Sequence, residues 1–321
     1  MSMKFLNIAP VDKDLLGRCR LNKPDLPNGG RFAMLSPFRA TISSDEADGL
    51  IAYLEAVTEK AGFHEVPQIV RIDTVPTDQG LKVIEVNADI PGGMGYIIAA
   101  LEAYGFPEEA DRFMMALLEV WGEEPHFLCD STWPAHQSII SMEIPLYQRH
   151  VPHLMSTDIQ TAGLRLRDVP YFRACGKAAF DSSTYNFSGV DMKNALGSWS
   201  VGDKTLLAKT AGPLAIEAEV RTFAVGDTVP AGVVVKDEFG LGGDGVYFPG
   251  QSVAVAGRYL VQEFVEFPTH DFDGTEKRYG LDVYIVGGKH LFALSRTARL
   301  DEDCLNVSQG GDMIPGILTV E

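Results

Sequence analysis

VRIDTVPTDQGLKVIEVNADIPGG, residues 70–93, is the stretch of this sequence that decides the fold. Two runs rich in Val and Ile flank the polar segment TDQG, a pattern that predicts a β-hairpin. Alternate side chains of a strand point to one face, so Arg71 and Asp73 share a face of the first strand. Glu85 and Asn87 share a face of the second strand in the same way. The hairpin therefore carries two pairs of polar side chains on otherwise apolar strands.

The register of the hairpin decides whether the two pairs meet. If Val75 pairs with Leu81 across the turn, Arg71 lies opposite Glu85 and the four polar side chains face the same way. We take this register as the expectation.

Two carboxylates and an amide oxygen on one face are hard ligands of the kind that Mg²⁺ prefers. The candidate ligands are Asp73, Glu85 and Asn87. The alternative is a solvated face of an exposed hairpin. Val83 and Val86 indicate instead a buried strand, on which polar side chains need partners.

The composition indicates a soluble globular protein. The chain has 321 residues, 45% hydrophobic and 22% charged, which suits two or three packed subdomains. Its net charge of −17 disfavours nucleic acid and anionic membrane surfaces as partners. Four scattered cysteines form no C-x-x-C pair, and no long apolar segment predicts a leader or a membrane span. We expect a cytoplasmic protein.

The rest of the chain reads as α+β to α/β, with short helices among many strands. Residues 1–40, rich in Pro, Gly and Asn, look irregular. A Ser-Ser-Asp run at 43–45 caps a predicted helix, and a PGGMG turn leads into another. Helices are expected over 96–105 and 111–122, and strands over 125–130, 232–239, 245–248, 259–267, 280–288 and 290–300.

The segment VVVKDEFGLGGDGV, residues 233–246, is the candidate phosphate-binding loop. A buried strand carries Lys236, and glycines that let backbone N–H groups approach an anion follow at once. A dinucleotide-binding loop should open into a helix, a kinase loop should have its lysine downstream, and a P-loop needs Lys-Ser/Thr after its last glycine. None of these fits, and a flexible Gly-rich hairpin stays open. The candidate glycines are Gly242, Gly243 and Gly245.

Two further segments complete the candidate site. The strand YLVQEFVEF, residues 259–267, can present its backbone to an adenine, although a plain amphipathic strand explains it as well. In LSRTARLDEDCLNVSQGG, residues 294–311, arginines offer forked donors to phosphate or carboxylate. The candidate residues are Gln262, Glu263, Phe264, Val265, Arg296, Arg299 and Asn306.

Together these elements resemble the ATP-grasp superfamily. Its members commonly show a strand lysine before a Gly-rich loop, a hinge of the Q/E-E-F/Y-V type, an arginine strand and then an acidic strand ending in E-x-N. Here the acidic strand comes first, at residues 70–93. This order resembles the circularly permuted, glutathionylspermidine-synthase-like group, in which an R-x-D strand pairs with an E-x-N-A-D strand.

The resemblance implies a permuted ATP-grasp fold, with two antiparallel-sheet lobes gripping ATP beside a small α/β domain. Residues 1–124 would form the acidic, metal-binding half of the core, and 125–200 the partner domain. Residues 201–265 would form the lid, and 266–321 would return to the core.

The resemblance also implies an ATP-dependent carboxylate–amine ligase that forms an acyl phosphate and releases ADP and phosphate. Lys236 and Lys204, with Lys209 as the alternative, would hold the ATP phosphates. Asp73, Glu85 and Asn87 would bind one or two Mg²⁺ ions, Arg296 or Arg299 would steady the transferring phosphoryl group, and Arg71 would orient the carboxylate.

The competing functions are a phosphotransferase on the same fold and a non-catalytic nucleotide-binding homologue. The expected substrates are amino-acid or peptide-like molecules, and a homo-oligomer is left open.

Overall fold

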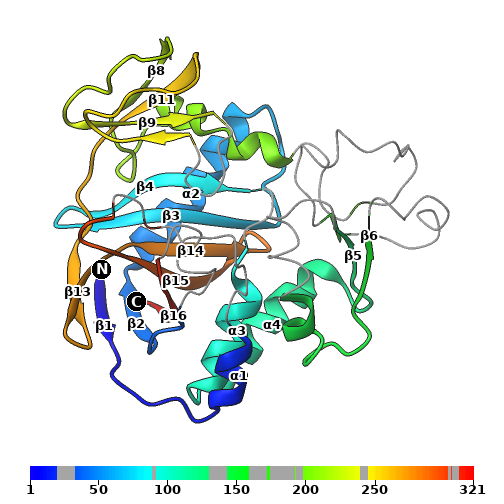
Figure 1. Ribbon diagram of the computed structural model, residues 1–321. Helices are drawn as coiled ribbons and strands as arrows, with labels where there is room; N and C mark the ends of the chain where they lie inside the picture. Colours follow the sequence, from blue (N-terminus) through cyan, green and yellow to red (C-terminus); the bar gives the residue numbers. More distant parts are fainter. Residues whose placement is uncertain are drawn as a thin grey trace.

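The computed structural model describes residues 1–19, 33–88, 92–129, 143–158, 172–173, 192, 198–238, 245–302, 305 and 311–321. These residues form a mixed α+β fold built on three sheets, of which two are largely or wholly antiparallel (Figure 1). The coarse fold class predicted from the sequence is therefore confirmed.

The largest sheet draws strands from both ends of the chain. Its main path is β1-β2-β16-β15-β14-β3-β4, and the β12–β13 hairpin joins it through β15. Neighbouring strands are antiparallel except β16 and β2, which run parallel. The strands are β1 (Ser2–Phe5), β2 (Phe38–Ile42), β3 (Ile69–Thr77), β4 (Gly80–Asn87), β12 (Thr269–Phe272), β13 (Thr275–Tyr279), β14 (Leu281–Val286), β15 (His290–Arg299) and β16 (Met313–Val320).

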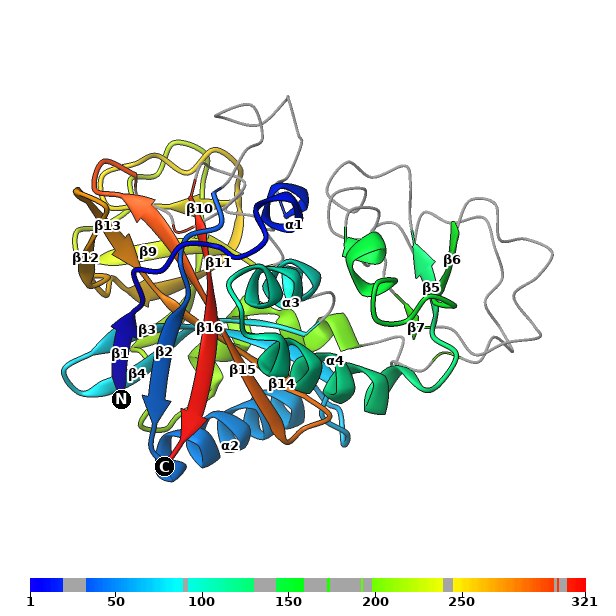
Figure 2. The same cartoon turned by 90° about the horizontal axis from the view of Figure 1, so that it is seen from below.

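Helices cover both faces of this sheet (Figure 2). On one face, α1 (Lys13–Arg18), α3 (Met94–Ala103) and α4 (Pro107–Trp121) share a core with side chains of β14, β15 and β16. On the other face, α2 (Ser44–Lys60) packs on β2, β3, β4 and β14. The predicted helix cap is confirmed, because Ser43 and Glu46 form a reciprocal capping box.

A separate four-stranded antiparallel sheet lies beyond the β4 edge, at the top of Figure 1. Its order is β10-β9-β11-β8, and it has a small apolar core of its own. Two 3-10 helices, η2 (Ser198–Gly202) and η3 (Lys204–Lys209), join it to the β3–β4 hairpin. The strands are β8 (Ala218–Phe223), β9 (Val233–Asp237), β10 (Val246–Tyr247) and β11 (Gly257–Glu263).

The third sheet is parallel, in the order β6-β5-β7, and lies beside α4. Its strands are β5 (His126–Cys129), β6 (Met155–Asp158) and β7 (Phe172–Arg173). A helical turn at 143–147 lies between β5 and β6 in the chain and fixes this sheet to the core. Trp121 makes edge-on ring contacts with Phe127 and Tyr147, at centroid distances of 4.9 and 5.0 Å.

The hairpin register differs from the expectation by one residue near the turn and by two residues at the polar positions. Pro76 pairs with Leu81, and a bulge follows Asp73. As a result Asp73 lies opposite Glu85, and Arg71 lies opposite Asn87. The assumed register was wrong because the sequence gives no sign of the pairing at the turn or of the bulge, and the combined shift of two residues keeps the polar side chains on one face.

Two segments were misread from the sequence. The first forty residues are not irregular throughout, since they contain β1, α1 and the start of β2. The internal strand β16 was missed, because Pro315 and Gly316 are unfavourable in a strand interior. The fold uses this glycine: a Cβ on Gly316 would lie 2.4 Å from Phe38 Cζ and 2.8 Å from Ala293 Cβ.

We predict that Gly316→Ala lowers the free energy of unfolding by about 1–3 kcal/mol, because the added methyl overpacks the space beside Phe38. Urea unfolding followed by circular dichroism measures it. The control is Gly17→Ala in α1, where a Cβ meets nothing within 4 Å. Equal stability of the two variants would contradict the close packing of β16 on β2 and β15.

Candidate functional site

Polar side chains of four neighbouring strands gather on one face of the large sheet. Arg71 of β3 pairs with Asn87 of β4 and with Tyr284 of β14. Asp73 pairs in the same way with Glu85 and with Asp282. Directly paired residues of adjacent strands project their side chains to the same side. The hairpin motif of the sequence is therefore one part of a wider polar strip, made of these residues and Arg296 of β15.

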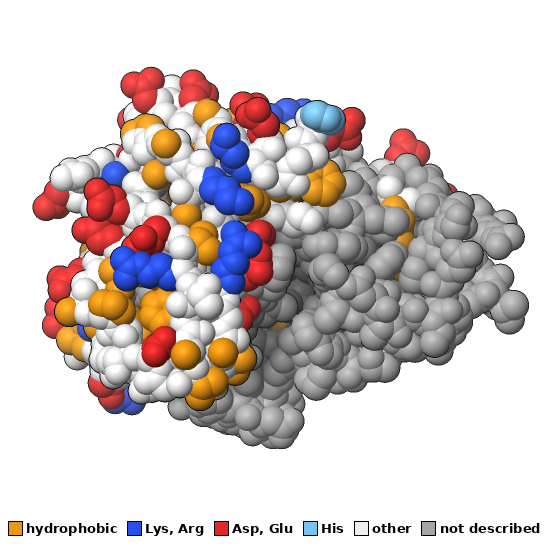
Figure 3. Space-filling view, turned by 90° about the horizontal axis from the view of Figure 1, so that it is seen from above, with side chains coloured by type: hydrophobic (Ala, Val, Ile, Leu, Met, Phe, Trp, Pro, Cys, Tyr) orange, Lys and Arg blue, Asp and Glu red, His pale blue; other side chains and the backbone are white. Residues whose placement is uncertain are grey.

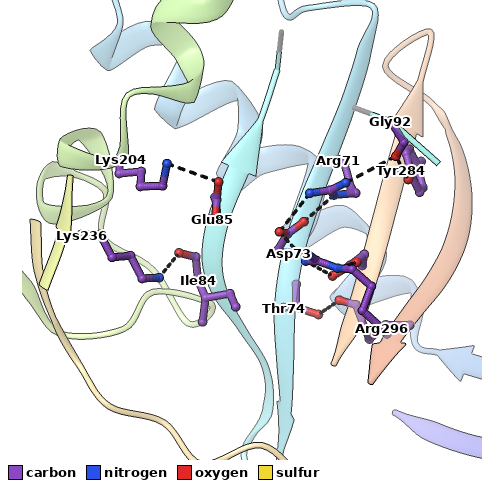
Figure 4. Close-up of polar contacts among 12 residues, drawn as sticks. Arg71, Asp73, Thr74, Ile84, Glu85, Gly92, Lys204, Lys236, Tyr284 and Arg296 are labelled. Carbon is purple, nitrogen blue, oxygen red and sulfur yellow. Dashed lines mark hydrogen bonds and ion pairs between the residues drawn. The ribbon is translucent and has the colours of Figure 1, made fainter. Parts of the chain in front are cut away.

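The centre of the polar strip is a buried arginine–aspartate cluster (Figure 4). Arg296 binds Asp282, with Nε 2.5 Å from Oδ2, and binds Asp73, with Nη2 2.6 Å from Oδ2. Arg71 binds the other oxygen of Asp73, with Nε 2.7 Å from Oδ1. The side chains of Asp73 and Asp282 are 3% exposed. Two cations and two anions thus hold β3, β14 and β15 together.

The pKa values of the two aspartates move in opposite directions. Burial raises the pKa of Asp73, but Arg296 and Arg71 outweigh it, so the net pKa is lowered. Burial raises the pKa of Asp282, Arg296 opposes this, and the nearby charge of Asp73 adds to the rise. Asp73, which contacts both arginines, is therefore the carboxylate that stays ionised most firmly.

Two lysines lie at the β4 edge of the polar strip (Figure 4). Lys236 comes from strand β9 of the four-stranded sheet, and Lys204 comes from the 3-10 helix η3 that precedes this sheet in the chain. Lys236 Nζ of β9 donates to the Ile84 carbonyl at 2.9 Å and to Gln262 Oε1 at 2.8 Å. Lys204 Nζ, at the start of η3, lies 3.4 Å from Glu85 Oε1, and its side chain is 4% exposed. Residues more than 100 positions apart thus converge on one strand, β4.

Gln262 of β11 orients the lysine of β9; the strand ends at Glu263, and Phe264 and Val265 follow it. The Gln262 side chain is buried and also lies 3.5 Å from the Val83 carbonyl. The amides of Glu263 and Phe264 donate to the carbonyls of Glu217 and Gly232. An adenine would therefore have to use other backbone groups of the 262–265 segment, which includes Val265.

The Gly-rich loop connects two antiparallel strands, β9 and β10, and a strand follows it, as the sequence predicted. Gly245 has a φ of 71°, and a Cβ there would lie 2.5 Å from Asp237 Cβ, so this position requires glycine. Gly242, Gly243 and Asn306 lie outside the described residues.

Two candidates lie apart from these contacts. Arg299 forms an ion pair with Asp301, and its side chain is 65% exposed. It is three residues from Arg296 on β15 and so faces the opposite side of the strand. The second is Lys209: its alternative, Lys204, is the lysine that lies beside Glu85.

The proposed magnesium ligands differ in how they are engaged. Both oxygens of Asp73 are bound to arginines. Glu85 is 25% exposed, and the buried Nδ2 of Asn87 has no hydrogen-bond partner among the described residues. That amide can turn to present its oxygen, so Glu85 and Asn87 fit a cation held between protein and phosphate. Among the described residues, no group of three or more His, Cys, Asp or Glu side chains could hold a metal alone.

Sequence reasoning missed three residues of this region: Asp282, Tyr284 and Glu143. Asp282 had a visible signal, since it is a lone carboxylate inside the apolar strand LDVYIV. Tyr284 donates to the Gly92 carbonyl at 2.6 Å, in the PGG turn that follows β4. Glu143 accepts hydrogen bonds from the amide of Gly93, in the same turn, and from the amide of Gly95, in the first turn of α3. Neither contact could be read from sequence spacing.

Lys and Arg side chains gather locally although the chain is acidic overall. Figure 3, which views the molecule from above Figure 1, shows Lys and Arg side chains in a band beside the grey residues, with Asp and Glu side chains next to several of them and around the edge. None of the described helices is long and apolar enough to span a membrane.

Comparison with known proteins adds a distant similarity. No protein-family model matches the sequence, and no curated protein matches it. Among solved structures, the chain is similar to that of "Putative gamma-glutamylcysteine synthetase from Methylobacillus flagellatus KT". The likeness covers 92% of this chain and 86% of that chain, with 10% sequence identity and a TM-score of 0.43. A likeness this distant carries no argument about activity, so we infer the function from the side chains.

We predict that Asp282→Asn lowers the free energy of unfolding by about 3 kcal/mol, because it removes one of the two carboxylates that neutralise buried Arg296. Urea unfolding measures the change. The matched control, Asp301→Asn, breaks the exposed pair with Arg299 and should leave stability nearly unchanged. Similar stabilities of the two variants would argue against a coupled, buried cluster.

Proposed function

We propose that this protein is a circularly permuted ATP-grasp enzyme that binds Mg²⁺-ATP between the four-stranded sheet and the β3–β4 hairpin. It would use ATP to convert a substrate carboxylate into an acyl phosphate, which an amine then attacks to form an amide. ADP and phosphate would be released. The sequence motifs support the family, and the side-chain geometry supports the location of the site.

The convergence of Lys204 and Lys236 on β4 is the observation that carries the proposal. Burying a lysine is costly unless its charge has partners. Both lysines are nearly buried, and both point at the strand that carries Glu85 and Asn87. Two cations facing two oxygen-rich side chains are suited to a polyphosphate with its metal ion.

The residues on the strip then have distinct tasks. Lys204 and Lys236 would hold the α- and β-phosphates, and Glu85 and Asn87 would hold Mg²⁺. Mg²⁺ supplies charge neutralisation between the phosphates. Asp73 could reach the metal only with oxygens that already bind Arg71 and Arg296. Its main task would be to hold those two arginines in place.

Arg296 and Arg71 would bind the groups that react. Arg296 is fixed by two aspartates, so its guanidinium is oriented before substrate arrives. It would stabilise charge on the transferring phosphoryl group. Arg71 lies next along the strip and would orient the attacking carboxylate. Catalysis by positioning and electrostatics needs no covalent bond to the protein.

We predict that Lys204→Ala and Lys236→Ala each weaken Mg²⁺-ATP binding by at least tenfold, because each removes a phosphate-binding cation. Calorimetry of the folded variants measures the dissociation constants. Lys209→Ala, in the same 3-10 helix as Lys204, is the matched control and should bind Mg²⁺-ATP nearly as the wild type does. Equal losses in all three variants, or no binding by the folded wild type, would refute the proposed site.

We predict that Glu85→Gln abolishes the Mg²⁺ dependence of ATP binding and the formation of ADP, while the fold survives because Glu85 is partly exposed. Binding is titrated with and without Mg²⁺, and ADP release is assayed across pairs of amino-acid-like acids and amines. Glu119→Gln, on a distant exposed pair with Lys289, is the control. Unchanged turnover by Glu85→Gln would remove the metal assignment. A phosphorylated acid released without amide would identify a phosphotransferase instead.

A further inference from the structure

Glu143 is a buried carboxylate that the proposed chemistry leaves unused. It lies in the helical turn described at 143–147, next to the three-stranded sheet, and is 2% exposed. Its Oε1 accepts the Gly93 amide at 2.8 Å, and its Oε2 accepts the Gly95 amide at 2.7 Å. The Tyr147 hydroxyl donates to Oε2 at 2.9 Å. Both oxygens are therefore committed to neighbours.

These contacts replace a missing helix cap. The first N–H groups of a helix have no partner within the helix and are usually satisfied by a nearby polar side chain. Helix α3 begins after Gly93, which has a φ of 107° and no side chain with which to cap. Glu143 supplies the acceptor from about 50 residues further along the chain. A carboxylate is also favourable at the positive end of a helix.

The capped turn is in direct contact with the polar strip. Gly92, beside the capped Gly93, accepts the Tyr284 hydroxyl at 2.6 Å and Arg71 Nη1 at 3.4 Å. Arg71 is in turn bound to Asp73. An added Cβ on Gly93 would lie 2.9 Å from the Tyr284 hydroxyl, so the turn and the strip pack closely. A shift of this turn would therefore move the acceptor that helps to orient Arg71.

We propose that Glu143 is a positioning residue, which locks the turn before α3 so that Gly92 holds Arg71 and Tyr284 in the geometry of the polar strip. It thereby couples the three-stranded sheet to the site. The effect on ligand binding rests on the proposed function, whereas the effect on Arg71 does not.

The charge of Glu143 provides a way to observe this coupling. Burial raises its pKa to about 7, although the Gly93 and Gly95 amides, Tyr147 and Arg71 each lower it. The other titratable groups that interact with Glu143 are Tyr96 and Tyr284, whose pKa values are raised by burial, so they remain neutral near pH 7. The folded protein therefore holds the Glu143 proton more tightly than the unfolded chain between pH 4.5 and 7. The contribution of Glu143 to stability falls as pH rises through this window and is constant above it.

The decisive experiment is a pH titration followed by NMR of the amides of Gly93 and Gly95 and of the Arg71 Nε–H. In the wild type all three signals should shift together with a midpoint near pH 7. In Glu143→Gln, which can accept from only one of the two amides, the transition should be absent from all three. Glycine signals that titrate while Arg71 stays unmoved would overturn the proposal, because Glu143 would then be a helix cap alone.

Mg²⁺-ATP affinity provides the second readout. At one fixed pH, Glu143→Gln should bind at least fivefold more weakly than the wild type, since Arg71 loses its fixed geometry. Tyr147→Phe keeps both glycine hydrogen bonds and should bind within about twofold of the wild type. Equal losses in both variants would contradict the proposal. If the wild type binds no ATP but Arg71 still titrates with Glu143, the proposed function fails and the positioning role stands.

Discussion

The bonding of Arg296 to both Asp73 and Asp282 is the interaction on which the rest of this structure depends. It joins three neighbouring strands in the middle of the large sheet, where removing a charge from water is costly unless it is fully paired. Arg71 completes the neutralisation from the other side of Asp73. The cluster can form only in the observed register of β3, β14 and β15. It therefore favours this alignment of the three strands over a shifted one.

The chain order explains why the site draws on distant segments. Strand β16, from the end of the sequence, lies between β15 and β2 in the same sheet that carries the β3–β4 hairpin. The four-stranded sheet then brings Lys236 to β4, 152 residues from its acceptor Ile84. Acidic and basic parts of the site lie far apart in sequence, and antiparallel pairing across the sheet together with the packing of η3 makes them neighbours.

Sequence reasoning succeeded where residues close together in the chain determine the local structure. Alternation placed Arg71 and Asp73 on one face, the Ser-Ser-Asp run at 43–45 marked the start of α2, and the strand after the Gly-rich loop argued against a dinucleotide-binding helix. It failed where a distant partner decides the local structure. Pro315 and Gly316 disfavour a strand by themselves, and β1 is too short to be recognised without its pairing to β2.

The sequence by itself determined the polar hairpin, the lysine before the Gly-rich loop and the order of the motifs, because these follow from the periodicity of strands and the chemistry of single residues. Only the tertiary structure decided the bulge after Asp73, the placement of Arg296 rather than Arg299 in the buried cluster, and the contacts of Asp282 and Glu143. Each of these depends on which groups lose water together when distant segments pack. Desolvation of that kind is a property of the assembled sheet and helices, and it has no signature in the spacing of residues along the chain.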